Sequence, residues 1–301
     1  MKQLSVHRLP FQAMGSGCEI VLAAADATQA AEQAQLAIDE VLRIERKYSR
    51  YRDDSVLAQI NAQAGLSSVA CDDETWSLLQ YADQLHSKSD GLFDITSGVL
   101  RRAWDFKHAL MPTPEALDRL RALVGWSRVK LHHQSIRLPE AGMEIDLGGF
   151  GKEYAADRAA VLLQQAGVAH GYVNLAGDMR FIGPRPDGSP WHIGIQHPRQ
   201  RGTVVATLPM RTGGLATSGD YERFFERDGQ RYCHVLHPET GRPVGHWQTV
   251  SVTAPLAVLA GCCSTIAMLK QAQGLEFLQA TGFDYLAIDQ QGVTHTRPAS
   301  V

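Results

Sequence analysis

This sequence has few cysteines, no long hydrophobic stretch and none of the common phosphate-binding motifs. Its 301 residues include five cysteines, an odd number with no C-x-x-C spacing, which argues against a disulfide framework and a zinc site. No apolar stretch is long enough to span a membrane, and the first residues lack the run of ~7–15 apolar residues typical of a signal peptide. As the sequence stands we expect a cytoplasmic protein in a reducing compartment, and a periplasmic one only if a leader has been removed.

An excess of charge of either sign is also missing. Lys and Arg number 29 against 32 Asp and Glu, with no polybasic block and no acidic tail, so we do not expect nucleic acid as a partner. The G-x-G-x-x-G, P-loop and G-x-S-x-G motifs are absent. The length allows a large core, and we expect one domain over 1–301, with two closely packed α/β subdomains as the variant.

The hydrophobic spacing predicts helices mixed with strands. Apolar residues recur near a 3.6-residue period over 27–51 and predict a helix there, and further helices are predicted over 73–91 (capped by Asp73), 113–125, 151–167 and 258–273. Alternating segments predict a hairpin over 128–139, a short strand at 143–147, and further strands within 170–183, 191–198, 203–210, 214–219, 231–238, 248–255 and 285–296. Because helices and strands do not alternate strictly, the predicted fold class is α+β.

The segment "DLGGFGKEYAAD", residues 146–157, places three glycines before a helix. Backbone N–H groups at such a helix start, together with Lys152, would suit a phosphate group, although a plain strand-to-helix turn has the same pattern. The sequence alone leaves both interpretations open.

Two other segments carry polar side chains that could do chemistry. His234 and His237 lie three residues apart, and in an extended strand they would face opposite sides, so a shared metal is disfavoured, while one could act as a general base. The run Thr217 to Asp220 offers small donors for a phosphate and a carboxylate for a metal, or simply a turn. The residues alone indicate no more than a small-molecule enzyme acting on a phosphate-bearing ligand.

Read in order, these segments resemble the ApbE family of FAD:protein FMN transferases. The similarity runs from "AMGSGCEI" through "YSRYRDDSVLAQIN", "SDGLFDITSGVL", "IDLGGFGKEYAADRA", "VNLAGD" and "WHIGIQHP" to "VSVTAP" and "FDYLAID". Its most diagnostic part is "TSGDY" followed by a histidine and P-x-T-G-x-P. The ordered set covers nearly the whole chain.

The resemblance implies a T-fold-like architecture with an FAD cleft and Mg²⁺ at the diphosphate. The family transfers the FMN half of FAD to a Thr or Ser hydroxyl of a target flavoprotein and releases AMP. On this basis His234 is the expected proton acceptor. The residues expected along the FAD cleft are Met14, Tyr51, Leu92, Phe93, Asp94, Lys152, Arg158, Val235 and Leu236.

At the metal site the sequence departs from the pattern A-D-A-x-[AD]-T that the family carries. Ala155 matches a backbone carbonyl ligand and Thr265 keeps the threonine, but Gly261 and Ser264 stand at the two aspartate positions. Mg²⁺ prefers charged oxygens, so these changes should weaken its binding, and the soft thiols of Cys262 and Cys263 cannot compensate. The two cysteines are expected to be packing residues of a helix.

The altered metal site leaves three functions open. The first is FMN transfer, with Mg²⁺ held by phosphate oxygens, Thr265, backbone groups and water. The second is an FAD-binding protein that has lost the transfer step. The third is an Mg²⁺-dependent FAD pyrophosphatase. The intact glycine turn, "TSGDY" and His234 favour transfer.

Overall fold

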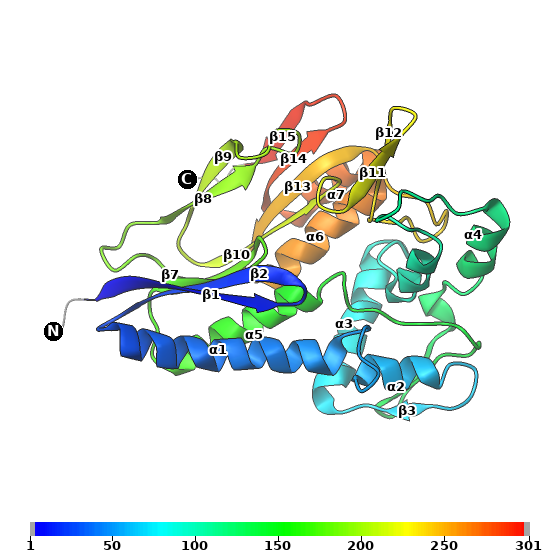
Figure 1. The fold of residues 1–301 in the computed structure, drawn as a ribbon, viewed down its shortest axis with the longest axis horizontal. Helices are drawn as coiled ribbons and strands as arrows, with labels where there is room; N and C mark the ends of the chain where they lie inside the picture. Colours follow the sequence, from blue (N-terminus) through cyan, green and yellow to red (C-terminus); the bar gives the residue numbers. More distant parts are fainter. Residues whose placement is uncertain (1–3, 298–301) are drawn as a thin grey trace.

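A computed structural model describes residues 4–297, within which an eight-stranded sheet forms the centre of the fold (Figure 1). Its strands are all antiparallel and run in the order β1-β2-β6-β7-β10-β13-β14-β15. The bounds are β1 Ser5–Ala13, β2 Ser16–Ala24, β6 Gly171–Leu175, β7 Asp178–Gly183, β10 Gly213–Gly219, β13 Trp247–Ala254, β14 Asp284–Asp289 and β15 Thr294–Arg297.

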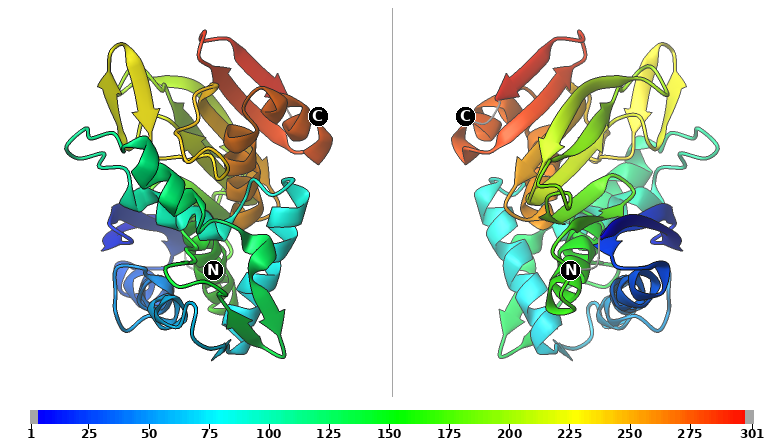
Figure 2. Two further views of the ribbon diagram at one scale, coloured as in Figure 1. Left: turned by 90° about the vertical axis from the view of Figure 1, so that its right-hand side faces the viewer. Right: turned by 90° about the vertical axis from the view of Figure 1, so that its left-hand side faces the viewer.

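The helices are α1 Ala27–Tyr48, α2 Val56–Ala62, α3 Asp73–Lys88, α4 Pro114–Arg121, α5 Gly151–Gln165, α6 Ala257–Lys270 and α7 Gly274–Thr281, with short 3-10 helices η1 Ile95–Arg102, η2 Trp126–Arg128 and η3 Gln271–Gln273. Helices α1, α5 and α6 pack on one face of the sheet, whereas α4 packs against η1 in a separate apolar cluster. Figure 1 and Figure 2 show α1 and α5 beneath β1 and β2. Within 4–297, no helix is both long and apolar enough to cross a membrane.

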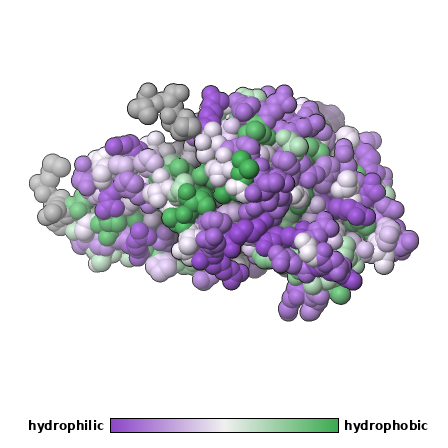
Figure 3. Space-filling view, turned by 90° about the horizontal axis from the view of Figure 1, so that it is seen from above, coloured by the Kyte–Doolittle hydropathy of each residue, from purple (hydrophilic) through white to green (hydrophobic). Residues whose placement is uncertain are grey.

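Smaller strand pairs complete the fold. They are β3 Val69–Ala70 with β5 Ser135–Arg137 and β4 Lys130–His132, β8 Trp191–Gln196 with β9 Val204–Met210, and β11 Phe224–Arg227 with β12 Gln230–Cys233. The β8–β9 hairpin lies away from the main helices in Figure 2 and buries a second apolar cluster, including Trp191 and Phe181. The face seen in Figure 3 is mainly hydrophilic, with a hydrophobic patch between the polar residues.

The α+β class is confirmed, with local corrections. The α3 cap is Asp72, not Asp73, because the Asp72 carboxylate accepts the Thr75 amide at 2.8 Å. The strand expected over 143–147 does not form. Alternate residues there are buried, but the side-chain amide of Asn61 pairs with both backbone groups of Ile145 in place of a neighbouring strand. The N-terminal hairpin β1–β2 was not predicted. One domain over 1–301 stays a prediction, and 1–3 and 298–301 lie outside the described residues.

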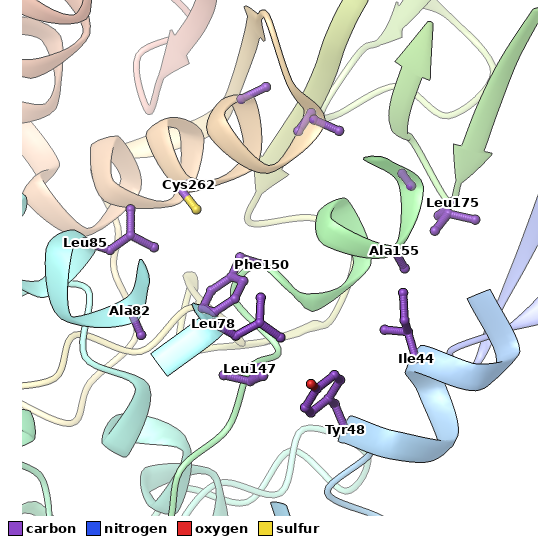
Figure 4. Packing of buried hydrophobic residues seen from close by; sticks show 14 of the residues in the cluster. Ile44, Tyr48, Leu78, Ala82, Leu85, Leu147, Phe150, Ala155, Leu175 and Cys262 are labelled. Carbon is purple, nitrogen blue, oxygen red and sulfur yellow. The ribbon is translucent and has the colours of Figure 1, made fainter. Parts of the chain in front are cut away.

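The adjacent cysteines lie on α6 and pack as expected. Figure 4 shows the Cys262 sulfur near Leu85, Ala82 and Phe150, and the Tyr81 hydroxyl donates to it at 3.5 Å. Burial raises the pKa of the Cys262 thiol well above its ordinary value and that of Cys263 to about 11. Both sulfurs are therefore protonated and inert at neutral pH.

Candidate active site

A cavity of about 1020 Å³ lies between the β1–β2 turn, the loop after α1, the start of α5, strand β10 and the segment after β12. Its size is at the upper end of ordinary ligand pockets, which hold ~300–1,000 Å³. Most of the predicted site residues line it, although they come from segments far apart in the sequence: Met14, Tyr51, Leu92, Phe93, Asp94, Lys152, His234, Val235, Leu236 and Thr265.

Four predicted residues lie outside the cavity lining. Arg158 is on another face of α5, where its Nε donates to Glu40 of α1 at 3.2 Å, and its contact with FAD stays a prediction. Ala155, Gly261 and Ser264 are buried within the helices beneath the cavity. The Ser264 hydroxyl is held by the Gly261 carbonyl at 3.0 Å and by Ser218 Oγ at 2.8 Å.

One end of the cavity is built from the β1–β2 turn and the loop after α1. Met14 adopts a positive φ of 53°, and its amide donates to Glu45 Oε1 of α1 at 2.8 Å, which fixes the turn against the helix. Tyr51 is 76% exposed, and the Arg50 guanidinium lies 4.7 Å from its ring centre. An exposed aromatic ring beside a cavity is suited to stack against a planar ligand.

The glycine turn before α5 forms the floor. Phe93 is 4% exposed, and a Cβ on Gly149 would lie 2.9 Å from the Phe93 ring, so only glycine allows this approach. Asp146 Oδ1 accepts the Gly148 amide at 2.9 Å, while its Oδ2 accepts from Arg101 at 2.5 Å and from Arg50 at 3.3 Å. The carboxylate thus holds the turn and orders two cations along the cavity.

The N-terminus of α5 opens into the cavity. No side chain caps this helix, and Gly149, Gly151 and Lys152 line the cavity there, so the positive end of the helix faces a ligand. Lys152 Nζ lies 2.5 Å from Asp178 Oδ2 of β7. Burial alone would lower the pKa of Lys152, but Asp178 and Glu153 raise it above its ordinary value, so the ammonium stays charged.

Asp94 has a structural task at the cavity wall. Its Oδ1 accepts the Thr96 amide at 2.7 Å and the Thr96 hydroxyl at 2.5 Å, and its Oδ2 accepts the Trp126 amide at 2.9 Å. The carboxylate is thereby occupied, and it shapes the wall rather than presenting a free charge.

His234 lines the same cavity and lies directly after β12. Its amide donates to the Arg223 carbonyl at 3.0 Å, and its Nδ1 is buried with no hydrogen-bond partner among residues 4–297. Burial, followed by the nearby charges of Arg101 and Arg223, lowers the pKa of His234 to about 4. The imidazole is therefore neutral at pH 7 and able to accept a proton.

His237 and Asp220 do not share this site. We expected a strand that would turn the side chains of His234 and His237 to opposite faces, but β12 ends at Cys233. His234 lines the cavity and His237 does not. Asp220 is 2% exposed and accepts both guanidinium nitrogens of Arg199 at 2.6 and 2.7 Å. Asp220 and Arg199 thus form a structural ion pair. Ser218, two residues before Asp220, does line the cavity.

Several lining residues were missed by sequence reasoning. Arg50, Arg101 and Arg223 come from three segments far apart in the sequence, so no motif predicts that they lie together. With Lys152 they give the cavity positive charge. Glu153, in the first turn of α5, is 7% exposed, and burial followed by the charge of Asp178 raises its pKa to about 8. Its Oε2 has no hydrogen-bond partner within the described part of the chain.

The family model described as the ApbE family matches residues 14–287. The chain belongs to the ApbE family. The protein named FAD:protein FMN transferase from Salmonella typhimurium is 31% identical over 295 residues, covering 93% of this chain and 83% of that protein. The protein of the same name from Treponema pallidum is 32% identical over 281 residues, covering 82% and 78%.

Solved structures of ApbE proteins share the fold. The ApbE protein of Thermotoga maritima has a TM-score of 0.89 at 29% identity and covers 97% of each chain. The apo form of the Pseudomonas stutzeri flavinyl transferase ApbE has a TM-score of 0.85 at 29% identity and covers 98% of this chain and 95% of that one. The family and the architecture expected from the sequence are confirmed.

Proposed function

We propose that this chain is an FAD:protein FMN transferase that moves FMN from FAD to a Thr or Ser hydroxyl of a target flavoprotein and releases AMP. One observation carries the proposal: in this ApbE-family chain, the neutral imidazole of His234 and the positively charged N-terminus of α5 with Lys152 line the same cavity. The relatives named above are transferases. They lend no support to an FAD-binding protein without transfer or to an FAD pyrophosphatase.

The chemistry of the lining supports the following proposed position of FAD. The isoalloxazine ring lies along Met14 and Tyr51, where an exposed aromatic surface is available. The diphosphate lies at the start of α5, where backbone N–H groups and Lys152 favour negative charge. Leu92, Phe93, Val235 and Leu236 supply the apolar walls. Arg158 is not part of this proposal.

The donors at the floor fit a divalent cation such as Mg²⁺. No group of three or more His, Cys, Asp and Glu side chains is gathered for a metal within residues 4–297. The cavity does hold the unpartnered Glu153 Oε2 and the Thr265 hydroxyl, with Ser218 Oγ 3.1 Å from Thr265 Oγ1. These are the hard oxygens that Mg²⁺ prefers, and the bound ion would neutralise charge on the diphosphate. The carbonyl of Ala155 stays a predicted ligand.

The chain's own groups account for positioning and proton transfer. The acceptor hydroxyl oxygen forms a bond to the phosphorus of the FMN half, the bond from that phosphorus to the bridging oxygen breaks, and the bridging oxygen leaves with AMP. His234 takes the hydroxyl proton as the oxygen attacks. Lys152 and the start of α5 hold the diphosphate in place, and the cations Arg101 and Arg223 offset its charge.

Product accounting tests the proposed function. The protein is incubated with FAD, Mg²⁺ and a purified flavoprotein that carries a Thr or Ser acceptor, and AMP, free FMN and protein-bound flavin are quantified by chromatography. Transfer gives AMP and bound flavin in equal amounts. Free FMN appearing with AMP would indicate hydrolysis instead, and FAD that binds without any AMP would indicate a binding protein.

Replacing Tyr51 by alanine is expected to weaken FAD binding. Stacking of a planar ring on an aromatic side chain contributes ~1–3 kcal/mol, so the Kd for FAD should rise about 10-fold. Flavin fluorescence titration measures this Kd. The matched control is Tyr51→Phe, which keeps the ring and should stay near the parent value; an unchanged Kd in Tyr51→Ala would remove Tyr51 from the flavin site.

A further inference from the structure

Glu153 is a buried carboxylate that the sequence did not single out. It lies in the first turn of α5 and lines the cavity, yet its side chain is 7% exposed with Oε2 unpartnered among residues 4–297. A buried carboxylate without partners is unfavourable unless a positive charge or donor accompanies it. Lys152, which precedes Glu153 in α5, already pairs with Asp178 at 2.5 Å.

The space that Glu153 occupies exists because residue 261 is a glycine. A Cβ built on Gly261 would lie 2.4 Å from Glu153 Oε1 and 2.6 Å from Glu153 Cγ, closer than any side chain tolerates. The Glu153 carboxylate on α5 thus fills the position into which a side chain at 261 on α6 would project. Residue 261 is where the family resemblance expects an aspartate.

The neighbours of this carboxylate are oxygen donors. Thr265 lies one helical turn after Gly261 on α6 and lines the cavity, and its Oγ1 is 3.1 Å from Ser218 Oγ of β10. Asp178 of β7 lines the same cavity, where its Oδ2 lies 2.5 Å from Lys152 Nζ at the start of α5. Carboxylate and hydroxyl oxygens from three elements therefore converge beside the start of α5.

We propose that Glu153 is the charged oxygen ligand of the divalent cation in this chain, taking the part of an aspartate at position 261. The carboxylate has moved from α6 to α5, and Gly261 makes room for it. The altered "AGCCST" segment then marks a rearranged metal site and not a lost one. This inference rests on the proposed function for the identity of the cation.

Metal binding measured without turnover tests whether Glu153 replaces an aspartate at position 261 as the ligand. Mn²⁺ is used as the probe, and its binding to the purified protein, with and without FAD, is followed by electron paramagnetic resonance. Loss of a ligand or of its support commonly costs ~10–100-fold in metal affinity, so Glu153→Gln should weaken Mn²⁺ binding by at least about 10-fold. Glu153→Gly should do the same, whereas Glu222→Gln, which removes another carboxylate of the cavity lining, should change it little.

The decisive variant combines Glu153→Gly with Gly261→Asp. It restores a carboxylate from α6 while removing the clash, and Mn²⁺ affinity should recover to within about 3-fold of the parent. Gly261→Asp alone should not gain affinity, because two carboxylates would compete for one space. Thermal melting of every variant confirms that it is folded.

The possible outcomes separate this inference from the proposed function. Unchanged Mn²⁺ affinity in a folded Glu153→Gln variant overturns the inference, and so does a folded double variant that fails to recover binding. In either case FMN transfer by the parent protein could still hold. Conversely, Mn²⁺ binding that follows Glu153 while the parent makes neither AMP nor bound flavin would overturn the proposed function alone.

Discussion

Replacing His234 by alanine is expected to lower kcat for FMN transfer by ~10²–10⁴-fold, the range in which a positioned proton acceptor contributes. His234 lines the cavity, has an unpartnered buried Nδ1 and is neutral at pH 7. The Kd for FAD should change little, because the imidazole acts on the acceptor hydroxyl. Single-turnover rates at saturating FAD and acceptor measure the effect.

The pH dependence follows from the lowered pKa of His234. Burial and the charges of Arg101 and Arg223 disfavour the imidazolium, with a pKa of about 4 in place of 6.5. Protonation removes the lone pair that accepts the hydroxyl proton, so transfer should be lost as the pH falls through about 4 and should change little near 6.5. An acid limb near 6.5 would contradict the assignment of His234.

His237→Ala is the matched control for His234→Ala. His237 lies three residues further along, is partly buried, and does not line the cavity. Its removal should leave kcat within about 3-fold of the parent, whereas a general loss of structure in this segment would affect both variants alike. Equal losses of kcat in the two variants would argue that His234 has a structural role only.

Replacing Trp247 by alanine is expected to lower the free energy of unfolding by ~3–5 kcal/mol, the usual cost of truncating a large buried aromatic. Trp247 begins β13 and is 1% exposed, and its Nε1 donates to the Gln271 carbonyl at 2.7 Å. Truncation leaves a cavity between the sheet and the end of α6 and orphans that carbonyl. Urea unfolding followed by circular dichroism measures the change.

Trp247→Phe separates volume from the hydrogen bond. It keeps most of the apolar volume and loses the Nε1 donor, so its cost should be roughly 1–3 kcal/mol, the penalty of a lost buried partner. A loss below about 1 kcal/mol in Trp247→Ala would mean that this end of the core repacks freely.

Local patterns predicted much of the fold. The predicted helices match α1, α3, α4, α5 and α6 within a few residues. The match is best explained for α1, which buries one stripe of residues near a 3.6-residue period. The hairpin β1–β2 was missed although its outer strand alternates, with Leu9 and Phe11 partly buried and Pro10 and Gln12 exposed. Residues 143–147 showed the alternation of a strand, but a side chain, Asn61, provides their pairing.

Only those residues of the site that lie in recognisable motifs could be predicted from the sequence. The glycine turn and His234 were singled out from their residues, the resemblance added "GLFD", and the structure brings all three to one cavity. The sequence did not predict that polar side chains of α5 face three directions: Glu153 faces the cavity, Asp157 accepts the first amides of α6, and Arg158 pairs with α1. The fit between Glu153 and Gly261 joins positions 108 apart and depends on the packing of two helices.

Intact mass of an acceptor flavoprotein tests the central claim most directly. The acceptor is incubated with this protein, FAD and Mg²⁺, beside a sample with EDTA and an acceptor whose Thr or Ser is replaced by alanine. We expect a mass gain equal to one FMN residue, abolished in both controls. Absence of any gain with acceptors that other ApbE transferases modify, while FAD stays bound and intact, would contradict it.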